Sequence, residues 1–217
     1  MKNKPIYLLF FYLFISMLFS NSYAESLDKV CQEKSNKIFC GNGVLDQVNY
    51  LNDVVFNGTR ILGHTNVLGD VNASHAYFNT LDMTGDFKGD DVVVAGDAKI
   101  LGDIHLENVI FHANVNITGD VKASKVQFMS PSKIVGNLTC DNGSFNSDLI
   151  LSSMSSTLTH TTTKNIEFTS DRRQQILYLY GATVNGSIKF SSNNGVIYSS
   201  EGSIITGNVI GGRVINQ

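Results

Sequence analysis

The chain has no tryptophan, two prolines and three cysteines, and 16% of its 217 residues are charged. So few cysteines exclude a small scaffold held together mainly by disulfides. The formal net charge of −3 at pH 7 excludes a strongly basic surface that would bind nucleic acid. After the first 24 residues, no segment is long and apolar enough to span a bilayer.

What the chain has instead is an internal repeat. Several segments open with the pattern apolar-x-Gly-Asp-apolar or apolar-x-Gly-Asn-apolar, at a spacing of 16 or 17 residues. They begin at Val67, Met83, Ile100, Ile117 and Ile134, and Leu151 opens a candidate sixth. A fixed period of this size indicates a repeat architecture.

Within each repeat, apolar residues occupy one position and again the position two residues later. This alternation predicts short strands whose inward side chains line up between repeats, so that Phe111 lies next to Phe128. The strands are too close together for intervening helices, which excludes βαβ units. The sequence therefore predicts an all-β, single-stranded parallel β-helix (a β-solenoid) with coils of about 17 residues and a short N-terminal cap.

The Gly-Asp pairs predict corners, because glycine tolerates positive φ and aspartate hydrogen-bonds nearby backbone. They also place four carboxylates in one column, followed by Asn137: Asp70, Asp86, Asp103 and Asp120. Two interpretations stay open, a ladder of cation sites or corner residues that accept backbone N–H groups. The second is favoured, because the G-G-x-G-x-D nonapeptide of calcium-binding β-rolls is absent.

Residues 1–24 are expected to be a signal peptide. Lys2 and Lys4 precede an apolar run, and Ser22 and Ala24 suit cleavage before residue 25. An uncleaved membrane anchor is the alternative. Cleavage would export the protein to the periplasm, the cell surface or the medium.

Residues 25–43 are expected to form the N-terminal cap, in a segment whose composition permits a helix. Cys31 and Cys40 lie in this cap and are a candidate disulfide for an oxidising compartment, with two free thiols as the alternative. The third cysteine, Cys140, falls in an inward column and is expected to be an inert core thiol.

Residues 44–217 are expected to form the solenoid domain. The Ser/Thr-rich stretch at about 152–164 breaks the pattern and predicts a protruding loop or an irregular coil. The repeat start then returns as V-N-G-S-I (184–188) and I-T-G-N-V (205–209).

The run Q-Q-I-L-Y-L-Y (174–180) is apolar on both alternating faces. Its fit to the columns predicts that Ile176 and Tyr178 point inward and that Leu177 and Leu179 point outward. A strand buried on both sides needs a cover. The Ser/Thr-rich stretch, another subunit or a ligand would supply it.

The columns carry no Ser-His-Asp spacing and no G-x-S-x-G elbow. The prediction is therefore a non-enzymatic protein with no cofactor, acting as a structural, adhesive or self-assembling element. The last residues, up to Gln217, run apolar and strand-like without a cap. Because open strand edges pair with other chains, self-association through the C-terminal end of the solenoid is expected.

The alternative is a carbohydrate-binding or carbohydrate-active β-helix. The one concentrated group of charges is Asp171, Arg172 and Arg173, with Glu167 and Tyr180 near them in the sequence. Such a set would bind an anionic glycan, and a solvated turn is the competing interpretation.

The starts V-L-G-D-V-N-A (67–73) and I-T-G-D-V-K-A (117–123) resemble those of the bactofilins, the polymer-forming bacterial cytoskeletal proteins. This resemblance covers residues 67–145. It implies a right-handed, short-coil β-helix that assembles end to end without nucleotide. Bactofilins are typically cytosolic, whereas this chain begins with an expected export signal.

Overall fold

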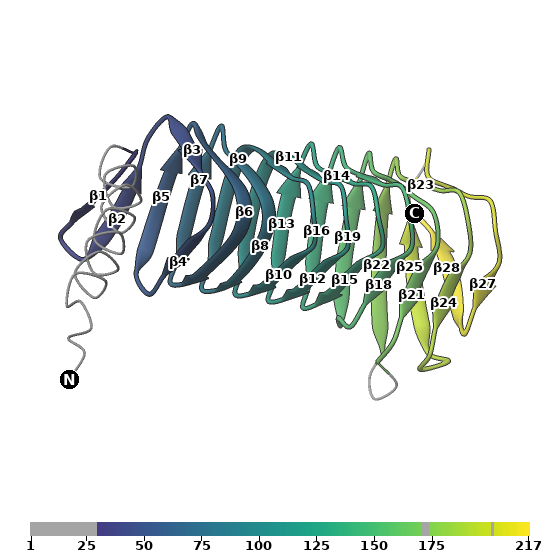
Figure 1. The fold of residues 1–217 in the computed structure, drawn as a ribbon. Helices are drawn as coiled ribbons and strands as arrows, with labels where there is room; N and C mark the ends of the chain where they lie inside the picture. The colour runs from purple at the N-terminus through teal and green to yellow at the C-terminus, as the bar shows by residue number, and fades with distance from the viewer. Residues whose placement is uncertain (1–29, 171–173, 201) are drawn as a thin grey trace, which may run out of the picture.

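The computed structural model describes residues 30–170, 174–200 and 202–217, and these residues form a three-faced β-solenoid of about ten turns (Figure 1). The predicted fold class and coil length are confirmed. From Lys37 onward, the strands pair in parallel with the equivalent strands of the next coil, as in the register Ile100–Ile117–Ile134–Leu151. The described residues contain no helix that is long and apolar enough to cross a membrane.

Three ladders of parallel strands make up the three faces of the rod. Face A consists of β2 (Lys37–Cys40), β5 (Asp53–Asn57), β7 (Val71–Ser74), the first halves of β9 (Phe87–Val94) and β11 (Ile104–Phe111), β13 (Val121–Ser124), β16 (Leu138–Asp141), β19 (Ser155–Thr159), β22 (Gln175–Tyr180), β25 (Gly195–Ser199) and β28 (Gly212–Asn216).

Face B follows face A within each coil. It consists of β3 (Gly43–Leu45), the first parts of β6 (Thr59–Leu68) and β8 (Tyr77–Thr84), the second halves of β9 and β11, β14 (Gln127–Phe128), β17 (Ser144–Phe145), β20 (Thr162–Thr163), β23 (Thr183–Val184) and β26 (Ile204–Ile205).

Face C closes the coil. It consists of β4 (Val48–Tyr50), the second parts of β6 and β8, β10 (Ala98–Leu101), β12 (Val115–Thr118), β15 (Ser132–Val135), β18 (Leu149–Leu151), β21 (Ile166–Phe168), β24 (Ile188–Phe190) and β27 (Val209–Ile210).

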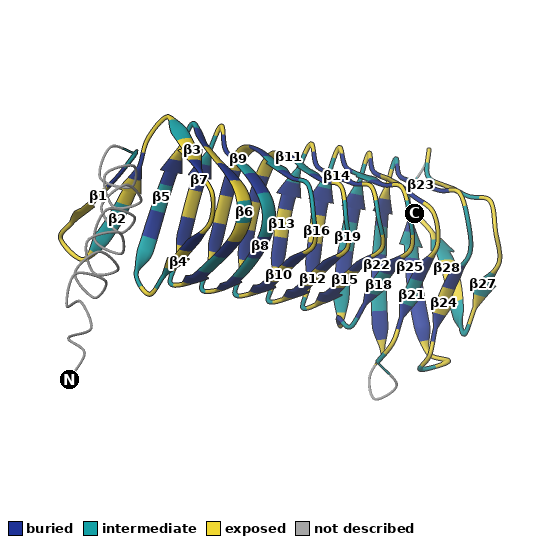
Figure 2. Cartoon of the chain, viewed as in Figure 1, coloured by how far each residue is buried: buried dark blue, intermediate teal, exposed yellow. Residues whose placement is uncertain are grey.

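A single dry core runs along the rod, and in Figure 2 the buried residues alternate with exposed ones along the strands. Its centre includes a stack of phenylalanines on successive coils. The ring centroids of Phe111 and Phe128 lie 5.1 Å apart, and those of Phe128 and Phe145 lie 4.6 Å apart, both nearly parallel. Like residues therefore stack as the columns predicted.

In the described part of the expected cap, residues 31–40 form a β-hairpin. Strand β1 (Cys31–Lys34) runs antiparallel to β2 through a two-residue turn in which Ser35 and Asn36 both have positive φ. Such turns match the twist of paired strands, and the Cys31–Cys40 disulfide joins the two ends of this hairpin. The helix-permissive interpretation is thus wrong for residues 31–34, and the ladder already begins at Lys37, inside the expected cap.

The Ser/Thr-rich stretch 152–164 is neither a protruding loop nor an irregular coil. Strands β19 and β20 pair in register with both neighbouring coils, and this coil is one residue longer than the one before it. The sequence concealed it because serine and threonine fill inward positions. The buried hydroxyls of Ser153, Ser156 and Thr161 bond each other or the backbone, as in Ser153 Oγ to Ser156 Oγ (3.0 Å) and Thr161 Oγ1 to the Thr159 carbonyl (2.8 Å). Thr163 Oγ1 is also buried but has no hydrogen-bond partner among the described residues.

The prediction for strand β22 is wrong by one residue. Leu177 and Leu179 are fully buried, and Ile176 and Tyr178 point outward. Pairing decides this, because Leu179 lies opposite the buried Leu158. A one-residue slip inverts every side chain of a strand.

The V-N-G-S-I and I-T-G-N-V segments are also out of phase with the earlier repeat starts. Val67 and its equivalents lead from face C to face A, whereas Val184 and Ile205 lie on face B and lead to Ile188 and Val209 on face C. The same motif therefore turns a different corner in the last two coils.

Candidate functional site: a polar groove on face A

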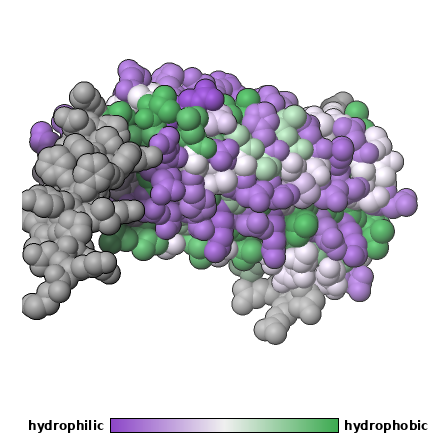
Figure 3. Space-filling model, viewed as in Figure 1, coloured by the Kyte–Doolittle hydropathy of each residue, from purple (hydrophilic) through white to green (hydrophobic). Residues whose placement is uncertain are grey.

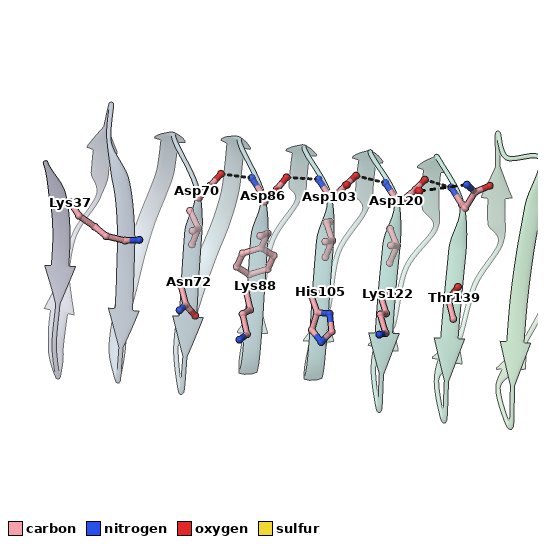
Figure 4. A pocket seen from close by; sticks show the side chains of 15 residues that line it. Lys37, Asp70, Asn72, Asp86, Lys88, Asp103, His105, Asp120, Lys122 and Thr139 are labelled. Carbon is pink, nitrogen blue, oxygen red and sulfur yellow. Dashed lines mark hydrogen bonds between the residues drawn. The ribbon is translucent and has the colours of Figure 1, made fainter.

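A groove of about 690 Å³ lies along the N-terminal half of face A, parallel to the rod (Figure 4). It crosses strands β7, β9, β11, β13 and β16. One wall is the column Asp70, Asp86, Asp103 and Asp120, and the other is the outward column two residues later. Figure 3 shows hydrophilic residues in a band along the middle of the coloured surface, with hydrophobic residues above and below it.

The acidic wall is a continuous hydrogen-bond ladder. The backbone N–H of Asp86 donates to Oδ1 of Asp70 (2.9 Å), that of Asp103 to Asp86 (2.9 Å) and that of Asp120 to Asp103 (2.8 Å). Asn137 continues it at 2.7 Å. The structure therefore agrees with the interpretation of these residues as corner acceptors, and each such bond offsets part of the repulsion between stacked carboxylates.

Glycines make this ladder possible. Gly85, Gly102, Gly119 and Gly136 all have positive φ, between 136° and 157°. A Cβ at Gly119 would overlap the carbonyl oxygen of Gly102 in the preceding coil. The close stacking of these corners thus requires glycine, and it brings each aspartate under the next N–H group.

The opposite wall carries hydrogen-bond donors. Lys88, His105, Lys122 and Thr139 pair in register on successive coils and point outward, with Asn72 before them (Figure 4). Among the described residues, Lys88 and Lys122 form no ion pair and no hydrogen bond. Their ammonium groups are therefore available to a ligand.

The column that holds this donor wall continues into a group of tyrosines. Thr139 is followed by Thr157, Tyr178 and Tyr198 on successive coils. The Tyr178 and Tyr198 rings stack with centroids 5.2 Å apart, and the Tyr180 ring lies parallel to Tyr178 at 6.4 Å and is 39% exposed. We call Tyr178, Tyr180 and Tyr198 the tyrosine group.

The residues proposed from the sequence for glycan binding are not assembled into one site. Glu167 lies on face C, where Oε1 accepts a 2.8 Å hydrogen bond from Lys189 Nζ, and Tyr180 lies on face A. Asp171, Arg172 and Arg173 lie outside the described residues. The groove was missed because its walls are spread over five repeats, although the donor column was readable two residues after each aspartate.

Neither metal binding nor thiol chemistry is supported by a described site. Within residues 30–170, 174–200 and 202–217, no group of three or more His, Cys, Asp or Glu side chains is placed to hold a metal ion. Cys140 is buried, and burial raises the pKa of its thiol to about 11, which the hydrogen bond to Thr161 opposes. A thiol with so high a pKa is a poor nucleophile, as expected for a core residue.

Comparisons with known protein families, with curated proteins and with solved structures gave no match to this chain. The bactofilin resemblance therefore rests on the repeat motifs alone.

Proposed function

We propose that this chain is an exported, non-enzymatic β-solenoid with a structural, adhesive or self-assembling role at the cell surface, in the periplasm or in the medium. The observation that carries the proposal is the uninterrupted core and parallel ladder along the rod. A stiff rod with regular polar columns suits a part that presents surface or bridges partners. The disulfide in the cap is consistent with an oxidising compartment.

The bactofilin resemblance supports the self-assembling form of this role, and the last coil supplies a surface for it. Val214 is 43% exposed, whereas Ile197, its inward partner in the preceding coil, is fully buried. Ile204 and Ile210 are 54% and 51% exposed and point outward, where the preceding coil has Thr183 and Lys189. Arg213 is the one charged residue of strand β28, and an edge that is otherwise this apolar favours pairing with another chain.

A second copy in tail-to-tail arrangement fits this edge. A two-fold axis across the rod at β28 reverses strand direction, so β28 would pair antiparallel with β28 of the second copy, and β26 with β27. A register centred on Val214 joins the two cores and places Arg213 opposite Ile215 of the second copy. Like charges then do not meet directly.

Sedimentation and cell fractionation test the two parts of this role. Association that grows with the concentration of the chain supports assembly, and a monomer at all concentrations contradicts it. For export, the protein recovered outside the cytosol should begin at Glu25, and a cytosolic chain that retains residues 1–24 would contradict the proposal.

Carbohydrate binding is the second candidate function. The observation that favours it is the groove on face A together with the tyrosine group, which combines hydrogen-bonding walls with aromatic rings. The candidate glycan site is thereby placed on face A instead of around Glu167, and Tyr180 is the one residue that the two sites share. A glycan array spanning neutral and acidic polymers tests whether any sugar binds.

A further inference from the structure

We propose that the groove on face A binds a neutral, extended, β-linked polysaccharide that lies parallel to the rod axis, an inference that rests on the second candidate function. The groove volume, about 690 Å³, falls within the range of small-molecule and oligomer sites. Its walls are columns that repeat once per coil. A ligand matched to it must therefore be linear and periodic.

The charges of the two walls select a neutral ligand. The acidic wall presents Asp86 and Asp103 along one side, and the donor wall presents Lys88 and Lys122 along the other (Figure 4). A polyanion placed in the groove would meet the carboxylates, and a polycation would meet the ammonium groups. A polyhydroxylated chain instead donates to the carboxylates and accepts from the lysines, so both walls are used.

The acceptors are fixed before a ligand arrives. Each ladder aspartate is held through Oδ1 by the N–H group of the next coil, as Asp103 is held by Asp120. Among the described residues, Oδ2 of Asp70, Asp86 and Asp103 accepts no hydrogen bond. Because little side-chain freedom remains to be lost, hydrogen bonds from sugar hydroxyls to these oxygens carry a small entropic cost.

The direction and length of the groove fit an extended chain. Strands on successive coils are about 4.8 Å apart, which is close to the length of one sugar unit in an extended β-linked glycan. Each unit would then meet one aspartate and one donor. Farther along the same column lie Tyr178 and Tyr198, with Tyr180 beside them, and this tyrosine group offers aromatic contact to a longer chain.

Titration with cellohexaose and chitohexaose tests this inference, with hexagalacturonate as the anionic arm. We expect saturable binding of a neutral hexasaccharide by calorimetry, and shifts of the His105 imidazole signals by NMR during the same titration. Tighter binding of hexagalacturonate would overturn the neutral class of ligand.

Two groove variants locate the site. Asp103→Asn keeps the Oδ1 acceptor of the ladder, where Asn137 already occupies the same column, and removes one carboxylate oxygen. Lys122→Met keeps the apolar stem and removes a donor. Each should weaken binding about tenfold, the effect of losing one hydrogen bond to a charged group. Lys99→Met on face C is the matched control and should bind as the wild type does.

The outcomes distinguish an error in the location of the site from an error in the proposed function. If a neutral glycan binds, but neither groove variant weakens binding and the His105 signals do not shift, then the assignment of binding to the groove is wrong while carbohydrate binding stands. If no glycan binds at all, both proposals are overturned. Circular dichroism of each variant checks that the β-solenoid is intact.

Discussion

At the scale of single residues, the corners decide how closely the coils stack. The glycine corner between faces C and A needs positive φ and the absence of a Cβ. The corner between faces A and B also uses positive φ but tolerates side chains, and the residues there are His75, Asp91, Asn108, Lys125, Asn142 and His160. Asn, Asp and His are the residues that enter this region most easily, so part of this second corner was readable in the sequence.

Replacing a corner glycine should therefore be costly. Backbone strain alone is expected to make Gly119→Ala lower the free energy of unfolding by about 1–3 kcal/mol. The overlap of the new Cβ with Gly102 should lower it further. Urea denaturation measures the change. Gly41→Ala is the control, because a Cβ there meets nothing within 4 Å and should change stability by less than about 0.5 kcal/mol. Equal effects of the two substitutions would contradict this account.

The buried Cys140 should make stability fall in alkaline solution. Its folded-state pKa of about 11 lies above the ordinary value of 9.0, so the folded state retains the proton between these pH values while the unfolded state loses it. Stability present below pH 9 is therefore lost as the pH rises toward 11, by about 2–3 kcal/mol.

Denaturation curves at several pH values above 8 measure this loss. Cys140→Ala is the control, since Ala123 occupies the same inward column in the preceding coil. The variant should lose most of the slope, and an unchanged slope would assign the effect to other groups.

At the scale of elements, strand register determines which side chains are core. Strand β22 carries large apolar or aromatic residues on both of its faces, so its sequence permits either face to point into the core. Pairing with β19 and β25 selects the one in which Leu177 and Leu179 are inside. The outward tyrosines then stack on one another and reduce their own exposure.

This register predicts unequal effects of truncation along β22. Leu177→Ala should destabilise the protein by about 2–5 kcal/mol, because a fully buried side chain leaves a cavity. Ile176→Ala, on the outer side of the same strand, should cost clearly less. Thermal unfolding of the two variants compares their stabilities. A larger loss of stability for Ile176→Ala would support the opposite register, in which Ile176 points inward.

At the scale of the whole molecule, the two described ends of the ladder differ. The antiparallel strand β1 and the Cys31–Cys40 disulfide cover the N-terminal edge of face A, whereas the last coil leaves Val214 and Ile210 exposed. The inward residues Leu45 and Val48 at the start of the ladder are buried, whereas the inward Val214 at its end is 43% exposed. Association is therefore expected to be tail to tail and to close at two copies.

A charge at the centre of that edge should abolish association. Val214→Asp places two carboxylates at the proposed two-fold axis, and sedimentation should then show a monomer at concentrations where the wild type associates. Leu51→Asp is the control, because Leu51 is 77% exposed near the opposite end and should leave association unchanged. Loss of association in the control alone would move the interface to the N-terminal half.

The sequence by itself determined the β-solenoid, the coil length, the inward columns of residues 67–145 and the aspartate corners. These features are local, since alternation sets strand faces and Gly-Asp sets a bend. Only the tertiary structure decided which corner the V-N-G-S-I segment turns, which way Leu177 points, and that serines and threonines fill a core layer. A three-faced coil offers three equivalent bends, so the motif alone does not say which bend it makes. Which alternate side chains of a strand face the core is decided by pairing with the strands of adjacent coils. The groove belongs to the same class, because its walls exist only when residues about 17 positions apart are stacked.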